Sequence, residues 1–351
     1  MDVWKRFLAL QSHMQSFKSQ QSNNQDGLTT WQTLQLMSQA TQKYSNTKES
    51  IERIQEMLAR IMINTHTLTT PTLDPLGLCL EPLTALLNHS CTPNAHLVFD
   101  GRVLSLRSLV PIPKDTGITI SYVDTTNPTE IRRQELQCRY FFKCDCWACT
   151  RRFTNGKPEE TISLHTQQFV DRAVELQNEA STVSPVEGLG KLKKALSLLR
   201  KQGYSTSRQP YPALLHSCFL TAVACEDWVF ALITAVQSHL HVEPMQYLSS
   251  WHPIRVVRQW VLLRLVVHIA SLEAAHDGSI KALETFYVNW MLISKGLWQD
   301  VSEGVMKSHG VGKFSQQIAV FGEEMGIAGP KVNDEELVGE FRKLEKLAEK
   351  I

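Results

Sequence analysis

Three cysteines lie within six residues near the middle of the chain, at Cys144, Cys146 and Cys149. They are too crowded to form separate disulfide bonds to distant partners, and in a reducing compartment such crowding indicates a metal site. Zinc prefers four thiolate or imidazole ligands in a tetrahedron, so three thiolates leave one corner to be filled. The spacing predicts one zinc ion held by these three sulfurs and by a ligand from another part of the chain.

The spacing does not determine the fourth ligand, which a cysteine or a histidine could provide. Cys91 is favoured because it lies in the polar loop 88–94, which Pro93 restricts. Four thiolates leave no position open for water or substrate, so we expect a structural zinc. The sequence also lacks the His-Glu-x-x-His motif of zinc hydrolases. The alternative is a set of buried free thiols, although Asp145 and Lys143 suit a core poorly. The other candidate cysteines are Cys79, Cys138, Cys218 and Cys225.

The segment before this loop has the apolar spacing of helices. Apolar side chains recur every three or four positions across 3–63, for instance at Trp31, Leu34 and Met37. The polar stretch 19–27 interrupts the pattern. We therefore predict helices over 3–63 with a break in the middle.

Short runs typical of strands follow between 71 and 123. The dipeptide Asp100-Gly101 is a hairpin signal, and the prolines and glycines after it mark a further connection. This part is expected to be rich in strands and poor in helices. The predicted strands are 95–99, 102–108 and 117–122.

Beyond the cysteines the apolar spacing is again helical to the end, as at Leu189, Leu192 and Leu196. Helices separated by prolines suggest stacked antiparallel pairs of the tetratricopeptide type, although no clean repeat is visible. Charged residues, glycine and proline across 151–158 mark a boundary. The fold class predicted is α+β, with a helical segment 1–63, a strand-rich part 64–150 and an all-α domain 159–351.

The composition excludes several classes of protein. The 351 residues include 43% hydrophobic ones, and 36 basic against 35 acidic side chains give a net charge of +1. No net field therefore favours nucleic acid or an anionic membrane, and we expect no direct nucleic-acid binding. No apolar run reaches the roughly 20 residues that span a bilayer, and the first residues lack the features of a signal peptide. We expect a monomeric intracellular protein, located in the nucleus, the cytoplasm or both.

Three motifs in series resemble the C-terminal half of a SET domain with its post-SET zinc cluster. They are Leu-Asn-His-Ser-Cys-Thr-Pro-Asn at 87–94, Ile-Ser-Tyr-Val-Asp at 120–124, and Tyr-Phe-Phe-Lys at 140–143, which leads into the three cysteines. A helical insert before them and a helical domain after them are similar to the SET- and MYND-domain lysine methyltransferases. The resemblance covers 1–150 well and the rest loosely. It implies that Cys91 completes the zinc site.

The same resemblance implies methyl transfer from S-adenosylmethionine to a lysine of a protein, histone or non-histone. Asn64 and Asn88 would hold this cofactor by amide hydrogen bonds, and His89 by its backbone and its ring. Phe142 would lie near the adenine. Three of these residues have an alternative interpretation: Asn64 ends a helix, His89 is a hydrogen-bonded turn histidine, and Phe142 belongs to the core.

Two tyrosines complete the implied site. Tyr122 would lie where the cofactor meets the lysine channel, so it would both contact the cofactor and act in catalysis. Its phenol oxygen would accept C–H contacts from the methyl group and orient the amine. Tyr140 would form a wall of the channel. The alternative for Tyr122 is an ordinary half-buried aromatic at a strand end, and Asn94 is expected to hold its loop without contacting the cofactor.

The chain also departs from the family. Members begin with a strand pair and a Gly-x-Gly segment, followed by a MYND zinc finger, and neither is visible in this sequence. The Gly-x-Gly patterns at 188–190 and 310–312 lie in the helical half, where we expect glycines at helix ends. The resemblance therefore implies a SET domain without its N-terminal strands, through a truncated gene model or a reduced domain. The alternative function is an inactive SET-derived scaffold that binds partner proteins through the helical domain.

Overall fold

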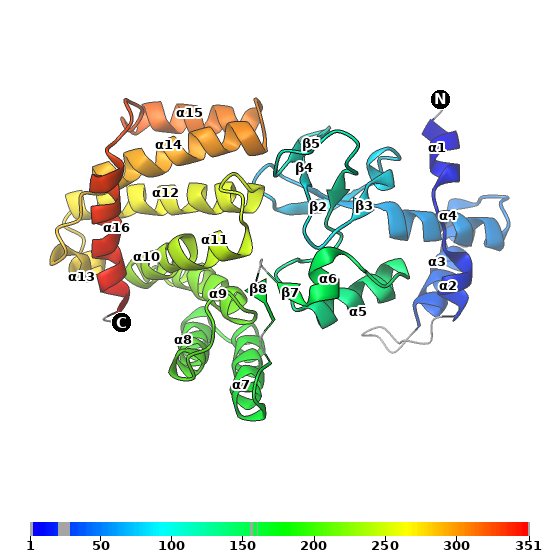
Figure 1. Ribbon diagram of the computed structural model, residues 1–351, viewed down its shortest axis with the longest axis horizontal. Helices are drawn as coiled ribbons and strands as arrows, with labels where there is room; N and C mark the ends of the chain where they lie inside the picture. Colours follow the sequence, from blue (N-terminus) through cyan, green and yellow to red (C-terminus); the bar gives the residue numbers. More distant parts are fainter. Residues whose placement is uncertain (1–2, 20–28, 155–156, 160, 350–351) are drawn as a thin grey trace.

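The strands of the chain lie between two helical regions, a small one at the N-terminus and a large one at the C-terminus (Figure 1). The computed structural model describes residues 3–19, 29–154, 157–159 and 161–349. The N-terminal end and the C-terminal end lie at opposite sides of the view in Figure 1. Residues of the strand-containing middle therefore contact helices on both sides.

The N-terminal helices are confirmed, and their starts follow from capping residues. Thr29 accepts a hydrogen bond from the backbone N–H of Gln32, whose side chain accepts one from Thr29 in return. Ser50 caps the following helix through its side-chain oxygen. The predicted break lies mostly outside the described residues. The helices are α1 (Val3–Ala9), α2 (Met14–Ser19), α3 (Thr30–Ser45) and α4 (Ile51–Asn64).

The middle of the chain forms short strand pairs, as predicted. The described residues contain a parallel pair, β3 with β6, and three antiparallel pairs, β1 with β2, β4 with β5, and β7 with β8. The bounds are β1 (His66–Thr69), β2 (Pro75–Cys79), β3 (Asn88–His89), β4 (Ala95–Asp100), β5 (Val103–Ser108), β6 (Thr119–Ile120), β7 (Phe153–Thr154) and β8 (Lys157–Pro158).

Two details of the strands differ from prediction. Asp100 pairs with Val103, so the hairpin loop is Gly101-Arg102 and only the glycine needs the left-handed backbone, with φ of 60°. The third predicted strand is shortened to β6. Its backbone N–H at Tyr122 donates to a histidine side chain instead of a neighbouring strand, which ends the ladder early.

The chain after the cysteines is helical, as predicted, apart from the β7–β8 hairpin. The helix at Thr129–Tyr140 was not predicted, because it lies in the part that was expected to be rich in strands. Pro185 occupies the first turn of α8, where its missing N–H costs nothing. The helices are α5 (Thr129–Tyr140), α6 (Trp147–Arg151), α7 (Leu164–Ala180), α8 (Pro185–Lys201), α9 (Tyr211–Ala224), α10 (Trp228–Gln237), α11 (Glu243–Gln246), α12 (Pro253–Ala274), α13 (Lys281–Glu284), α14 (Trp290–Ser308), α15 (Lys313–Glu324) and α16 (Asp334–Glu349), with short 3₁₀ or π turns at Thr84–Leu86, Ser238–Val242 and Gly278–Ile280.

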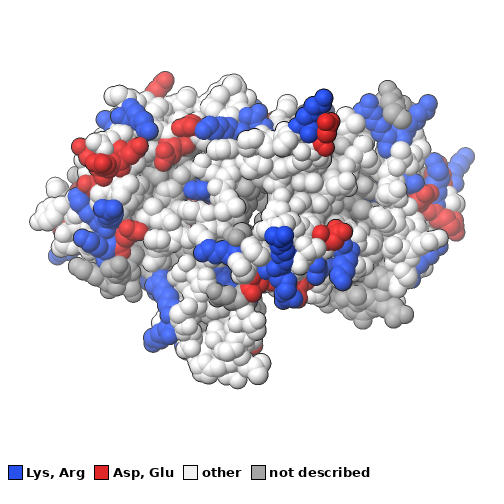
Figure 2. All heavy atoms as spheres, viewed as in Figure 1, with Lys and Arg blue, Asp and Glu red and all other residues white. Residues whose placement is uncertain are grey.

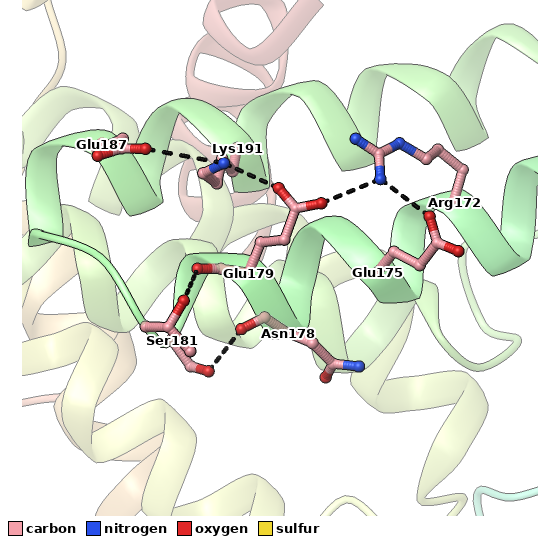
Figure 3. A network of polar contacts seen from close by, with 8 residues as sticks. Arg172, Glu175, Asn178, Glu179, Ser181, Glu187 and Lys191 are labelled. Carbon is pink, nitrogen blue, oxygen red and sulfur yellow. Dashed lines mark hydrogen bonds and ion pairs between the residues drawn. The ribbon is translucent and has the colours of Figure 1, made fainter.

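A large apolar core joins the C-terminal helices, and polar contacts reinforce their surface. Glu179, at the end of α7, accepts from Arg172 on the same helix at 3.0 Å and from Lys191 on α8 at 2.8 Å (Figure 3). These groups lie at the surface, where water screens their charges, so each contact adds little stability. The two helices are therefore held chiefly by their buried apolar faces.

The Gly-x-Gly patterns have two explanations. Gly310 follows α14 with φ of 82°, and Gly312 precedes α15, so these are helix-end glycines as expected. The prediction is wrong for Gly188, which lies inside α8. A Cβ there would stand 2.8 Å from the carbonyl oxygen of Ala180, so glycine is required by the close approach of α7.

The strand-containing middle and the C-terminal helices make specific polar contacts. Arg107 on β5 donates to the carbonyl oxygen of Met306 at the end of α14, at 2.9 Å. Nε2 of His309 lies 3.0 Å from the carbonyl oxygen of Pro71. Because these partners are more than 190 positions apart, the contacts fix the helical half against the strands.

Charged side chains on the face shown in Figure 2 and the polarity of the helices bear on two environments. Figure 2 shows basic and acidic side chains interspersed on this face, without a broad region of one sign. Among the described residues, every helix is too short or too polar to cross a membrane. The observed face thus gives no electrostatic reason to expect nucleic-acid binding.

Candidate active site and metal centre

Four cysteine sulfurs meet where the loop after β3 contacts the start of α6. They belong to Cys91, Cys144, Cys146 and Cys149, and all lie within 4.8 Å of one another. Sγ of Cys91 is 3.5 Å from Sγ of Cys149. Cys91, Cys144 and Cys149 are buried. The structure thus places beside the three crowded cysteines the residue that the sequence favoured as their partner.

This donor set fits a zinc ion. A tetrahedron with Zn–S bonds of about 2.3 Å has sulfur–sulfur edges of about 3.8 Å, so the four sulfurs need only small shifts to close around a metal. The hydrogen bond from Cys91 lowers the pKa of the Cys146 thiol and raises that of Cys91. A thiolate is therefore available, as metal binding requires.

Two neighbouring arginines of α5 hold the backbone near the cysteines: Arg133 bonds to the cysteine segment, and Arg132 bonds to the strand β7 that follows it. Arg133 donates to the carbonyl oxygens of Cys144, at 3.2 Å, and Cys149, at 3.0 Å. Arg132 is only 1% exposed and donates to the carbonyl oxygen of Phe153 at 2.8 Å. The sequence analysis missed both arginines, because the helical pattern of α5 does not show which face meets the cysteines.

A cavity of about 830 Å³ lies next to the cysteine cluster, between the strands, α4 and the C-terminal helices. Ligand pockets typically measure about 300 to 1,000 Å³. Within the lining, Asp124 is the single carboxylate and Arg139 the single guanidinium. All six residues expected from the sequence to contact cofactor or substrate line this cavity, namely Asn64, Asn88, His89, Tyr122, Tyr140 and Phe142.

The β3–β6 pairing positions the Asn-His motif. Asn88 pairs with Thr119 and His89 with Ile120. Asn94 locks β6 in place, since its side chain accepts from the N–H of Thr119 at 2.8 Å and donates to the carbonyl oxygen of Gly117 at 2.9 Å. The expectation that Asn94 holds its loop is therefore confirmed.

The ring of His89 already has partners on both nitrogens. Nδ1 accepts from the N–H of Tyr122 at 3.1 Å, and Nε2 lies 3.3 Å from Sγ of Cys91. Burial lowers the pKa of His89 to about 4, so the ring is neutral at neutral pH. Both ring nitrogens are thus engaged within the protein, and the contact of His89 with a cofactor stays a prediction.

Tyr122 is held at both ends. Its hydroxyl donates to the carbonyl oxygen of Leu87, and its N–H donates to His89. The hydroxyl of Tyr140 lies 3.5 Å from the carbonyl oxygen of Tyr122, and the two rings are 4.9 Å apart. Burial raises the pKa of both phenols. Both therefore stay protonated near neutral pH, so neither acts as a base, and each hydroxyl oxygen can still accept a hydrogen bond.

Phe142 and Asn64 complete the expected set. The ring of Phe142 meets that of Tyr122 edge-on, with centroids 6.5 Å apart. Asn64 is the last residue of α4, and its amide nitrogen donates to the carbonyl oxygens of Gln11, at 2.9 Å, and Arg60, at 2.8 Å. Only its amide oxygen is thus left for a ligand, and the residue also serves the helix end.

The C-terminal half adds lining residues that the sequence analysis did not find. Tyr247 and His252 lie between α11 and α12 and stack with centroids 4.5 Å apart. His252 also meets His96 of β4 edge-on at 5.2 Å. No local pattern marks these residues, because their role depends on how the helical half packs against β4.

Comparison with known proteins agrees with this geometry. Residues 11–123 match the SET domain. The chain is 32% identical over 157 residues to SET domain and MYND-type zinc finger protein 6 of Schizosaccharomyces pombe. It is 37% identical over 110 residues to histone-lysine N-methyltransferase ASHR1 of Arabidopsis thaliana, and 26% identical over 215 residues to N-lysine methyltransferase SMYD2 of Rattus norvegicus.

These alignments are partial on both sides. They cover 45%, 31% and 56% of this chain, and 32%, 22% and 49% of the respective relatives. The chain thus spans at most about half the length of these relatives. Within that limit the chain carries a SET domain and is similar to SET- and MYND-type proteins, as its motifs predicted.

Proposed function

We propose that this SET-domain chain transfers a methyl group from S-adenosylmethionine to the side-chain amine of a lysine in a protein. The observation that carries the proposal is the gathering of six polar and aromatic residues around one cavity, from segments up to 78 positions apart (Asn64 to Phe142). Relatives named as lysine methyltransferases support it. They give no support to the alternative of an inactive scaffold.

The cavity offers suitable groups for a cationic cofactor that bears an adenine. The amide groups of Asn88 and Asn64 and the backbone of His89 would bind its polar atoms. Phe142 would present its ring to the adenine. The described lining carries one carboxylate, Asp124, and one guanidinium, Arg139, so its formal charges balance.

The two phenols would align the reacting amine. S-adenosylmethionine supplies an electrophilic methyl group bound to a sulfonium sulfur. The lone pair of the lysine nitrogen forms a bond to the methyl carbon as the carbon–sulfur bond breaks. The product amine loses its proton to water. Tyr122 and Tyr140, both protonated, would hold the neutral amine in line and exclude water from it.

The cysteine cluster would hold one structural zinc. Four thiolates leave no open coordination position, so the metal would not contact the substrate. It would fix the loop of Cys91 to the segment 144–149. Zinc binding requires reduced thiols, and a reducing compartment such as the nucleus or the cytoplasm provides them.

The C-terminal helices would form the outer wall of the substrate site. Tyr247 and His252 bring this half to the edge of the cavity. Helix pairs stacked as in tetratricopeptide domains create surfaces that bind peptides. We propose that the C-terminal helices form a domain of this type. A lysine-bearing segment such as a histone tail would enter between the two halves.

A transfer assay tests the function. The purified chain is mixed with S-adenosylmethionine that carries a labelled methyl group and with core histones or cell proteins. The label is expected in protein as methyl-lysine, and Tyr122→Phe should reduce it. Absence of labelled lysine with every substrate, in protein shown to be folded, would contradict the proposal.

A further inference from the structure

The imidazole of His89 lies between the cysteine cluster and the backbone of Tyr122. Nε2 is 3.3 Å from Sγ of Cys91, and Nδ1 is 3.1 Å from the backbone nitrogen of Tyr122. The ring is half-buried, with Tyr122 and Phe142 packed beside it at centroid distances of 5.3 and 6.0 Å. These two rings therefore help to fix the orientation of the imidazole.

The geometry fixes the proton on this ring. A backbone N–H can only donate, so Nδ1 must be the acceptor from Tyr122. The neutral ring then carries its hydrogen on Nε2, which faces Cys91. When Cys91 is a metal thiolate, this contact becomes a hydrogen bond to a charged acceptor, a stronger type than a neutral one.

We propose that His89 is a positioning residue that couples the cysteine-bound metal to Tyr122. The segment 87–91 holds Tyr122 twice, at its hydroxyl through Leu87 and at its N–H through His89, and it ends at Cys91, which would bind the metal. The metal thereby sets the position of the Tyr122 phenol in the cavity. The inference rests on the proposed function for its consequence in catalysis, but the link itself does not.

Three substitutions separate the two contacts. In His89→Asn, the amide oxygen can take the place of Nδ1 toward Tyr122 but nothing reaches Cys91. In His89→Gln, the amide nitrogen can take the place of Nε2 toward Cys91 but the acceptor for Tyr122 is lost. His89→Phe keeps a flat ring and removes both hydrogen bonds, so it controls for packing alone.

The first readout is the rate at which zinc passes to an excess of a colorimetric chelator. Losing a hydrogen bond to a metal ligand typically costs about 10- to 100-fold in metal affinity. We expect release from His89→Phe and His89→Asn to be faster by at least about 10-fold, and release from His89→Gln to stay within about 3-fold of the unmodified chain. Equal rates in all four proteins would overturn the inference.

The second readout is the amide signal of Tyr122 in a chain with isotope-labelled tyrosine, which gives at most 7 signals. Tyr122→Phe identifies the relevant one. The signal should move in His89→Gln and His89→Phe and stay in His89→Asn, and an unmoved signal in all three would overturn the inference. Neither readout uses methyl transfer, so the expected pattern in a chain without activity would contradict only the proposed function.

Discussion

The sulfur of Cys91 lies 3.5 Å from the sulfur of Cys149, although 58 positions separate the two residues in the sequence. This contact joins the loop that follows β3 to α6. The strand β3 itself supplies the lining residues Asn88 and His89 to the cavity. The cluster and the cavity are therefore parts of one arrangement, and changes at the sulfurs should be felt by the cavity.

Metal analysis of the purified chain should find one zinc per molecule. Cys149→Ser removes a buried ligand, so it should lose the metal and lower the melting temperature, because the binding energy of a structural zinc contributes to folding. Cys225→Ser, at the end of α9 and outside the cluster, is the control and should keep its zinc. A folded chain without metal would contradict the zinc site.

Tyr122→Phe should lower the rate of methyl transfer with little change in cofactor affinity. The hydroxyl is the group placed to orient the amine, and removing one hydrogen-bonding group that acts on the transition state typically costs about 100-fold or more in kcat. Tyr44→Phe, with 81% of the residue exposed, is the matched control. Equal kcat in both variants would remove Tyr122 from the mechanism.

Arg132→Met should destabilise the fold without touching the cavity. The buried guanidinium donates to the carbonyl oxygens of Asn127 and Phe153, and leaving a buried acceptor unpaired costs about 1 to 3 kcal/mol. Chemical denaturation measures the free energy of unfolding. Arg139→Met, an exposed position on the same helix α5, should change it by less than about 1 kcal/mol, and similar losses in both variants would refute the role of Arg132.

Acid should weaken the fold through three histidines at the contact of strands and C-terminal helices. Burial lowers the pKa of His96, His252 and His309, the last to about 4, whereas an unfolded histidine titrates near 6.5. Above pH 6.5 all are neutral in both states and give no slope. Below it the unfolded chain binds protons that the folded one does not, so stability falls by up to about 1.4 kcal/mol per pH unit for each group.

Denaturant titrations on both sides of that pH measure the effect. His309→Gln should show a shallower loss of stability on acidification than the unmodified chain, because one of the depressed groups is gone. Parallel pH profiles for the two proteins would show that His309 does not contribute.

Local sequence patterns predicted the helices and strands better than they predicted the contacts between distant segments. The helices of the N-terminal segment and of the C-terminal half follow from apolar spacing, because one face of each must be buried. The cluster of four cysteines could also be predicted, since Cys91 lies in a restricted polar loop and was favoured as the fourth ligand. The site residues were identified by resemblance, and the cavity now brings them together without testing their roles.

The remaining features depend on contacts between distant segments. The end of β6 could not be foreseen, because it follows from the hydrogen bond between Tyr122 and the ring of His89. Tyr247 and His252 reach the cavity only through packing of the helical half against β4. The requirement for glycine at position 188 also could not be predicted, since it results from the close approach of Ala180 on another helix.

Calorimetric titration of the zinc-loaded chain with S-adenosylmethionine tests the account most directly. We expect saturable binding at one site per chain, weakened by about 10-fold or more in Asn88→Ala, because a polar contact to the ligand is lost. Asn46→Gly, a left-handed helix-end residue outside the cavity, should bind as the unmodified chain does. Absence of binding by a folded, zinc-loaded chain would contradict the proposed methyl transfer.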